Sequence, residues 1–498
     1  MTALPPLRRA SAPSVRGAPR QAGWRSAGAT LSICTAALLG ACAALPPSGQ
    51  DEPLVEVPAA WSDDAAAAAA AATPTPPPPW WALFGEDLLS QIVEQALQRN
   101  PDIVGARAAL AQAQAQRDLA AAARGPTVGL TGSIQRARSG GRSAENEFRA
   151  GVDAGWSPDP FGVLAQAQTA EEATVRQRTA ELGEAELAVA AQVALEYIGL
   201  RGGQARLAIA RDNLAIQRAT LQITEWRAQA GLVSALEVEQ ALAATEQTLA
   251  QLPALQTGIV RAVHALAVLA GRPPASLDAL LGAEGSVPVT TLDPMPDVPA
   301  ETLRQRPDVR AAEQAVASAA ARLAQADAAR MPNFRLGGSL SVGAVTLAGL
   351  SSGAALASSL LASVSLPLFD GGAATAQVMV QRAALRQAHA AYRGTVLKAL
   401  REVEDALVVL RSGRERQARL QQAAQSAAAA AQLARYRYGS GLADFQTVLE
   451  TQRNALATRD ALASARADLS AGQVRLVQAL GGGWRETGVP LVMTKARP

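Results

Sequence analysis

The chain has 498 residues, of which 49% are hydrophobic and only 3% aromatic, and its formal net charge is +3. Five arginines and no acidic residue lie before position 42. Removing that segment leaves 41 basic against 43 acidic residues, a net charge of −2. The mature charge therefore gives no support to nucleic-acid binding. We also expect no membrane-spanning helix in the mature chain, because we find no run of 18 or more strongly apolar residues.

Residues 1–41 are typical of a lipoprotein signal peptide. An arginine-containing region and an apolar run end in Leu39-Gly40-Ala41-Cys42, which resembles the recognition sequence of bacterial lipoproteins. The pattern predicts cleavage before Cys42 and acylation of its thiol, and Ala43 favours sorting to the outer membrane. The alternative is an ordinary signal peptide with an incidental cysteine. Cys34 leaves with the leader, so no thiol remains for a disulfide or a metal site.

Residues 42–79 are predicted to form a lipidated tether rich in alanine and proline. Eight alanines occupy positions 65–72 and four prolines occupy positions 76–79. Proline-rich segments remain extended, and eight residues are too few to hold an isolated helix. We therefore expect an extended connection between Cys42 and the folded part of the chain.

The first structural repeat is assigned to residues 80–295. Apolar residues at helical spacing precede a predicted helix over Pro101–Ala123, and Pro126 ends helical structure. Alternating apolar and polar residues then predict strands at about 127–138 and 147–157. Long helices follow these strands.

The second structural repeat is assigned to residues 296–484, because the sequence that starts at Pro101 recurs from Pro307 without a gap. Both copies contain a Pro-Asp start, a proline break and a Leu-x-Gly-Ser strand. The second pair of strands is predicted at about 333–343 and 358–369, and residues 485–498 form a C-terminal tail. A soluble antiparallel sheet would show the same alternation as these strands.

Closure of the sheet separates these alternatives. Strands that face lipid cannot have open edges, and four strands cannot close around a channel. Two chains would give eight strands, which side chains fill, whereas three chains would give twelve, enough for a pore. The apolar faces expected to meet lipid include Leu336 and Leu366.

The helix from Gly162 to about Gln229 contains no proline, which predicts about 67 residues and roughly 100 Å at 1.5 Å per residue. Two heptad series lie on opposed sides of it. A wall of helices needs two such seams, whereas a two-helix coiled coil needs only one. The two series are Leu200, Leu207, Leu214 and Leu221, and Ile209, Ile216 and Ile223.

Gly202-Gly203 in this helix and Ser412-Gly413 in the second copy lie at matching places, so we expect the helices to be interrupted and bent there. A cytosolic coiled-coil rod is the alternative for the heptads. A lipoprotein signal and four amphipathic strands do not fit such a rod.

Two segments carry a resemblance to a known family. Arg437–Glu450 (RYGSGLADFQTVLE) and Pro367–Gly372 (PLFDGG) closely resemble the TolC-like outer-membrane efflux proteins of Gram-negative bacteria. The resemblance spans about Trp80 to Trp484, and the lipoprotein start points to the drug-efflux branch. It implies an α+β membrane protein with a trimeric, 12-stranded β-barrel and a coiled-coil, α-helical periplasmic tunnel.

The resemblance also implies a function and partners. The homotrimer would sit in outer-membrane lipid and extend into the periplasm. It would passively conduct drugs or other small solutes from an inner-membrane pump of the proton-driven RND type, joined through a periplasmic adaptor protein. A conduit for type I protein secretion is the alternative, because it uses the same architecture.

A periplasmic gate is the third implication. The loops Gln229–Ser234 and Gly439–Asp444 are expected at the end away from the strands, and the final helix would narrow the entrance with acidic residues. The matching positions are Asp444, Thr447, Glu450 and Arg453. Glu450 fits the acidic position, whereas Thr447 departs from the acidic or apolar residues found there in some members. Alternatively, Glu450 and Arg453 form an ordinary surface ion pair.

The residues that an enzymatic function would require are not found together in the sequence. The two histidines, His264 and His389, lie in different repeats without paired acids, so neither a metal site nor a catalytic triad is expected. The segment Gly349–Gly353 matches a nucleophile elbow in sequence, but it joins two predicted strands and is interpreted as a surface loop. We expect no catalytic residues, no metal and no cofactor.

Overall fold

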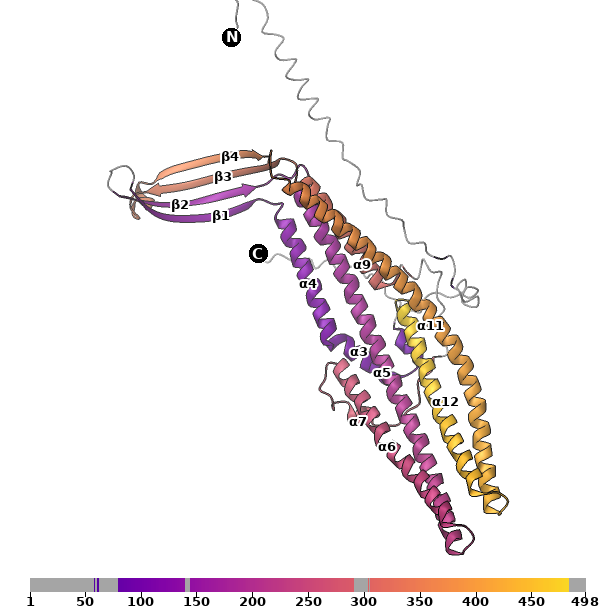
Figure 1. Cartoon of the computed structure of the whole chain (residues 1–498). Helices are drawn as coiled ribbons and strands as arrows, with labels where there is room; N and C mark the ends of the chain where they lie inside the picture. Colours follow the sequence, from indigo (N-terminus) through magenta and orange to yellow (C-terminus); the bar gives the residue numbers. More distant parts are fainter. Residues whose placement is uncertain are drawn as a thin grey trace, which may run out of the picture. The chain divides into compact units, whose positions relative to one another are not determined.

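The computed structural model describes residues 58, 61, 79–138, 144–290, 303 and 305–482. The predicted signal peptide, Cys42, most of the tether and the tail 485–498 lie outside the described residues. All described residues belong to one compact unit, Pro53–Pro498. Within it, a four-stranded sheet lies at one end of a set of long helices (Figure 1).

The same sequence of principal elements occurs twice, and the matching helices are equal in length. Helices α4 and α9 have 22 residues each, α5 and α11 have 67 each, and α6 and α12 have 35 each. The first copy comprises η1 (Trp80–Phe84), α3 (Asp87–Arg99), α4 (Pro101–Ala122), β1 (Thr127–Ala137), β2 (Glu145–Trp156), α5 (Val163–Gln229), α6 (Ala235–Leu269) and α7 (Asp278–Leu281). The second comprises α9 (Pro307–Ala328), β3 (Asn333–Ala344), α10 (Gly349–Ser352), β4 (Ala355–Ser365), α11 (Ala373–Gly439) and α12 (Phe445–Ala479).

The sheet is antiparallel in the order β1-β2-β3-β4, and its register aligns the predicted faces across all four strands. Leu130 lies opposite Val152, and Val152 lies opposite Leu340. One face therefore carries apolar side chains that remain exposed in the single chain. They include Val128, Leu130, Ile134, Val152, Leu340, Leu356, Leu360 and Val364. The other face carries small and polar residues such as Thr131, Arg149, Asp153 and Ser339.

The fourth strand lies earlier than predicted. It was expected at about 358–369, but β4 ends at Ser365, so Leu366 and Leu368 do not belong to the sheet. Pro367 explains the shift, because proline has no N–H to donate to a strand ladder and restricts the residue before it.

The helices pack side by side, with α5 against α4, α6, α9 and α12, and α11 against α9 and α12. The predicted leucine seam is used inside the chain, since Leu200, Leu207 and Leu214 are buried. The isoleucine seam is less covered, and Ile223 is 40% exposed. One seam of α5 is thus filled by the chain itself, while the other remains partly available.

The paired glycines do not interrupt the helices as expected. Both α5 and α11 run continuously through these sites. A Cβ added at Gly202 would lie 2.9 Å from the Cβ of Ala467, and one at Gly203 would lie 3.2 Å from Ile259 Cγ1. The glycines therefore allow α12 and α6 to approach α5 closely.

One helix meets the length and composition criteria for a membrane span. Among the described helices, α6 alone is long and apolar enough to cross a membrane by length and composition, with a mean hydropathy of 1.4 over its most apolar window. Only 17% of that window is buried inside the chain. Its alanines, leucines and valines give this helix apolar side chains that its own chain leaves largely uncovered.

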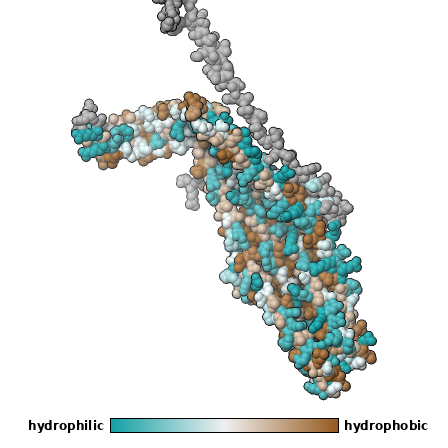
Figure 2. Space-filling view, in the orientation of Figure 1, coloured by the Kyte–Doolittle hydropathy of each residue, from teal (hydrophilic) through white to brown (hydrophobic). Residues whose placement is uncertain are grey.

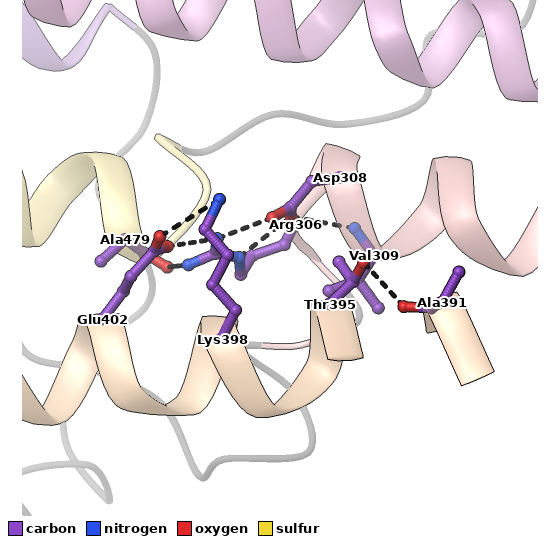
Figure 3. A network of polar contacts seen from close by, with 8 residues as sticks. All are labelled: Arg306, Asp308, Val309, Ala391, Thr395, Lys398, Glu402 and Ala479. Atoms are coloured by element: carbon purple, nitrogen blue, oxygen red, sulfur yellow. Dashed lines mark hydrogen bonds and ion pairs between the residues drawn. The ribbon is translucent and has the colours of Figure 1, made fainter. Parts of the chain in front are cut away.

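A buried arginine joins three helices where the second repeat begins. Arg306 precedes α9 and donates to both carboxylate oxygens of Asp308, at 3.0 and 2.7 Å, to Glu402 at 2.7 Å, and to the backbone oxygen of Ala479 at 2.7 Å. Figure 3 shows these groups converging from the start of α9, from α11 and from the end of α12. The charge is matched by two carboxylates, as a buried cation requires.

Candidate functional site

Two loops reverse the chain at the end of the helices away from the sheet (Figure 1). The two loops have the same backbone geometry. Gly231 and Gly441 have φ values of 70° and 76°, a left-handed conformation that favours glycine. The amides of Leu232 and Leu442 donate back to Arg227 O and Arg437 O, at 2.8 and 2.7 Å. We call the loops with their adjacent helical turns the first and second tips.

Asp444 and Thr447 together start α12. The Asp444 carboxylate accepts a hydrogen bond of 2.8 Å from the Thr447 N–H, which satisfies one free amide of the first turn. Hydrogen bonds from the Thr447 side chain and backbone lower the pKa of the Asp444 carboxyl below its ordinary value. Both residues are exposed. Asp444 is therefore a helix cap, whatever else it does.

Glu450 and Arg453 are exposed on α12, and they do not pair. Among the ion pairs of the described residues, none joins these two side chains. The adjacent Val448 and Leu449 are buried against the neighbouring helices. At the second tip, one face of α12 is thus packed inside the chain, whereas the Glu450 carboxylate is accessible to groups outside it.

A contact between the two tips was missed by the sequence reasoning. Arg227 on α5 donates to Tyr438 O at 2.9 Å, and its guanidinium lies 4.5 Å from the centroid of the Tyr438 ring. The Tyr438 hydroxyl donates to Glu237 of α6 at 3.3 Å, and its ring meets Phe445 edge-on. Arg227 and Glu237 lie 211 and 201 positions from Tyr438 in the sequence, so no local spacing signals these two contacts. An arginine and a tyrosine beside the two glycine turns were the only indication.

Each tip also exposes an aromatic residue and a leucine at matching positions. Trp226 and Leu232 are 59% and 69% exposed in the first tip, and Tyr436 and Leu442 are 58% and 71% exposed in the second. Figure 2 shows hydrophobic residues interspersed with hydrophilic ones over the visible surface of the helical part. Exposed aromatic side chains of this kind are common at protein–protein contacts.

No chemistry-bearing cluster stands out among the described residues. His264 lies on α6 and His389 on α11. Instead of an irregular loop, Gly349–Ser352 forms the short helix α10 between β3 and β4, and the Ser351 hydroxyl donates to Ala348 O. In the part of the chain that the structure describes, no group of three or more potential ligands could hold a metal ion.

The sequence profile described as "Outer membrane efflux protein" matches residues 92–272 and 298–482. The outer membrane protein OprJ of Pseudomonas aeruginosa is 32% identical over 61% of this chain, and the match spans 63% of OprJ. The pyoverdine export outer membrane protein OpmQ of Pseudomonas putida is 32% identical over 81% of this chain and 87% of OpmQ. The solved structure of the outer-membrane channel OprN matches with a TM-score of 0.79 and 33% identity, covering 87% of this chain and 99% of the OprN chain.

Proposed function

The chain belongs to the outer membrane efflux protein family, and we propose that it is the exit duct of a three-part efflux system. It is an outer-membrane protein whose helices extend into the periplasm. In the proposed system it passively conducts drugs or other small solutes delivered by an RND-type inner-membrane pump through a periplasmic adaptor. The name of the relative OpmQ concerns export of pyoverdine, which favours a small molecule over a secreted protein as cargo.

The sheet carries this proposal. Its apolar face is continuous across four strands, its opposite face is polar, and β1 and β4 each pair on one side only within the chain. Such edges cannot face lipid unpaired. Three copies would close twelve strands into a barrel with a polar interior, which is enough for an aqueous pore.

Two neighbouring leucines in β4 test the barrel. Leu360 lies on the apolar face and Leu361 on the polar face, and both are exposed in the single chain. Leu360→Arg would place a charge in lipid at a cost of about 2–4 kcal/mol near the bilayer midplane. We expect it to reduce the trimer recovered in mild detergent, while Leu361→Arg leaves the trimer intact. Equal trimer recovery from both variants would contradict the assigned faces.

The gate is proposed at the second tip, with Glu450 as the main constricting residue and Arg453, Thr447 and Asp444 beside it. Its support is that Glu450 is exposed and unpaired with Arg453. Three carboxylates brought together by trimer symmetry would repel each other and bind cations. Glu450→Ala should raise single-channel conductance in planar bilayers and weaken block by divalent cations. Conductance and block identical to those of the wild type would exclude the gate role.

The adaptor is proposed to dock on the tips, where Trp226 and Tyr436 are exposed. Trp226→Ala should weaken adaptor binding to the purified trimer without changing single-channel conductance. An unchanged affinity of both Trp226→Ala and Tyr436→Ala would place the adaptor elsewhere.

Lipidation is proposed at Cys42, which lies outside the described residues. Cells grown with labelled palmitate should label the wild-type protein and not Cys42→Ser. Equal labelling of both proteins would disprove the assignment.

A further inference from the structure

An open cavity lies among the long helices, close to the sheet. It has a volume of about 930 Å³ and is lined by residues of four helices. Ala123 directly follows α4 and Ala329 directly follows α9, while Ala167 and Gln377 lie near the starts of α5 and α11. Six of the lining residues are alanines, and their small side chains leave the space open.

The four helices form a row in the order α4-α5-α9-α11. Helix α4 packs on α5, α5 packs on α9, and α9 packs on α11 (Figure 1). The cavity touches the two outer helices of this row as well as the two inner ones. A single hollow can do so only where the row curves around it, so the cavity lies on the concave side. When three copies close into a tube, their concave sides face the axis of that tube.

The charged residues of the lining are two arginines and one glutamate. Arg322 on α9 lies 3.9 Å from Glu171 on α5, and 51% of its side chain is exposed. Arg178 on α5 pairs with Glu181, which is not part of the lining. An excess of positive charge therefore lines the cavity, and three copies would repeat it around the axis. A cleft lined by one sign of charge concentrates ions of the opposite sign.

Four glutamines make much of the remaining lining hydrophilic. Gln116 comes from α4, Gln325 from α9, and Gln377 and Gln381 from α11. In the described part of the chain, these side-chain amides have no hydrogen-bond partner. An amide can donate to an anion and can also accept from a cation, so the glutamines do not select a charge. The charge preference of the cavity therefore depends on the arginines.

We propose that this cavity is a solute-contact site of the duct, and that Arg178 and Arg322 make the duct favour anionic solutes. Glu171 belongs to the same site and offsets part of the positive charge. The proposal rests on the proposed function, because closure of three copies is what turns the cavity toward the path of the solute.

Reversal potentials measure this preference in the purified trimer. In planar bilayers under a KCl gradient, Arg178→Gln combined with Arg322→Gln should lower the ratio of chloride to potassium permeability by about twofold or more. Glu171→Gln should raise the ratio, because it removes the offsetting charge. Low salt suits the measurement, since charges are screened within about 10 Å at 0.1 M ionic strength.

Arg176→Gln is the matched control. It removes the same charge from α5, but Arg176 lies outside the lining, two positions before Arg178 and about 200° around the helix. The permeability ratio should stay at the wild-type value in this variant. An unchanged ratio in the double arginine variant, or an equal shift in Arg176→Gln, would overturn the proposal.

A chemical measurement separates this proposal from the channel function. Gln377→Cys places a thiol in the lining, and mass spectrometry can follow its reaction with an anionic and a cationic methanethiosulfonate reagent in the purified protein. Adding Arg178→Gln and Arg322→Gln should lower the ratio of the anionic to the cationic rate by about twofold or more, whereas adding Arg176→Gln should not. A lowered ratio in a protein that does not conduct would support the charged site and contradict the channel function. An unchanged ratio in a conducting protein would overturn the charge preference alone.

Discussion

Both repeats contain a hydrogen bond from a side chain to the backbone oxygen at the end of a long helix. The donating side chain differs between the two repeats. In the first repeat, Asn100 donates from Nδ2 to the backbone oxygen of Leu269, the last residue of α6, at 3.0 Å. In the second, Arg306 makes the equivalent bond to Ala479, the last residue of α12, at 2.7 Å. Each donor directly precedes a proline that begins a helix. We call these two places the first and second junctions.

A left-handed glycine accompanies each junction. Gly271 and Gly481 have φ values of 67° and 86°. A Cβ at Gly271 would lie 2.5 Å from Arg99 O, and one at Gly481 would lie 2.9 Å from Gln305 O. The close backbone approach is therefore common to both copies, and only glycine fits it.

The difference between the junctions shows that the hydrogen-bond donor can be exchanged. The last carbonyls of a helix need donors, and either an amide or a guanidinium can supply one. The guanidinium adds a charge, and the second junction balances it with Asp308 and Glu402. The backbone geometry is thus shared, whereas the electrostatics belong to one copy.

The strongest test of this difference is Arg306→Ala. It removes the Arg306 guanidinium from the Asp308 carboxylate and leaves Glu402 with Lys398, 3.7 Å away, and breaking a buried pair by removing one partner costs about 3–5 kcal/mol. The control is Arg206→Ala, which removes a similar two-bond contact to Asp460 whose side chains are 40% and 35% exposed. Exposed pairs contribute at most about 1 kcal/mol. Unfolding in detergent should separate the two variants, and a loss of equal size would contradict a special role for the second junction.

The shared backbone approach predicts the next largest effect. Gly271→Ala forces a left-handed conformation on a residue with a side chain and places its Cβ against a carbonyl oxygen, so we expect a loss of about 1–3 kcal/mol or more in unfolding free energy. Gly105→Ala in α4 is the matched control, because its Cβ meets nothing within 4 Å. That control should stabilise by up to about 1 kcal/mol. Stabilisation by both changes would rule out the close approach.

The neutral donor of the first junction should matter less. Asn100 also accepts a hydrogen bond from the Asp102 N–H at 2.8 Å, so Asn100→Ala removes a cap and a buried bond together. We expect a loss of about 1–2 kcal/mol in unfolding free energy, below that of Arg306→Ala. Asn100→Asp keeps the acceptor for the Asp102 N–H and loses the donor to Leu269 O, so it should separate the contribution of the helix cap from that of the buried hydrogen bond. A larger loss than that of Arg306→Ala would reverse the ranking of the two junctions.

The sequence predicted the elements better than their contacts. The absence of proline predicted the length of α5, and alternation predicted the faces of β1 to β3. The apolar pattern predicts that the fourth strand continues to about residue 369, whereas Pro367 is consistent with the observed end of β4 at Ser365. Helix propensity predicts an interruption at Gly202-Gly203, whereas the structure shows that these glycines allow α12 and α6 to pack closely on α5.

Contacts between distant segments could not be predicted. The Arg227–Tyr438 contact and the Arg306 network join residues that no spacing relates. The same holds for burial, since α6 and α12 have 35 residues each but 7 and 15 buried ones. The heptads of the two helices are similar, so they do not indicate which helix packs between neighbouring helices. The fold of the whole chain determines this.

The two tips offer the smallest and most selective test. Asp444 caps α12, whereas Ser234 at the matching position makes no side-chain cap bond to α6. Asp444→Ala should therefore slightly destabilise the protein, and Ser234→Ala should not. Because hydrogen bonds from Thr447 lower the folded-state pKa of Asp444, its charge stabilises the fold above the ordinary carboxyl pKa, and this contribution is lost as pH falls through the lowered value.

Asp444→Asn separates the cap from the proposed gate. Asparagine keeps an acceptor for the Thr447 N–H, so the tip should stay folded while the contribution of Asp444 to the acid dependence of the unfolding free energy disappears. If the charge also faces the channel entrance, single-channel conductance changes in Asp444→Asn as much as in Asp444→Ala. If Asp444 serves only as a cap, Asp444→Asn conducts like the wild type, and the constriction belongs to Glu450.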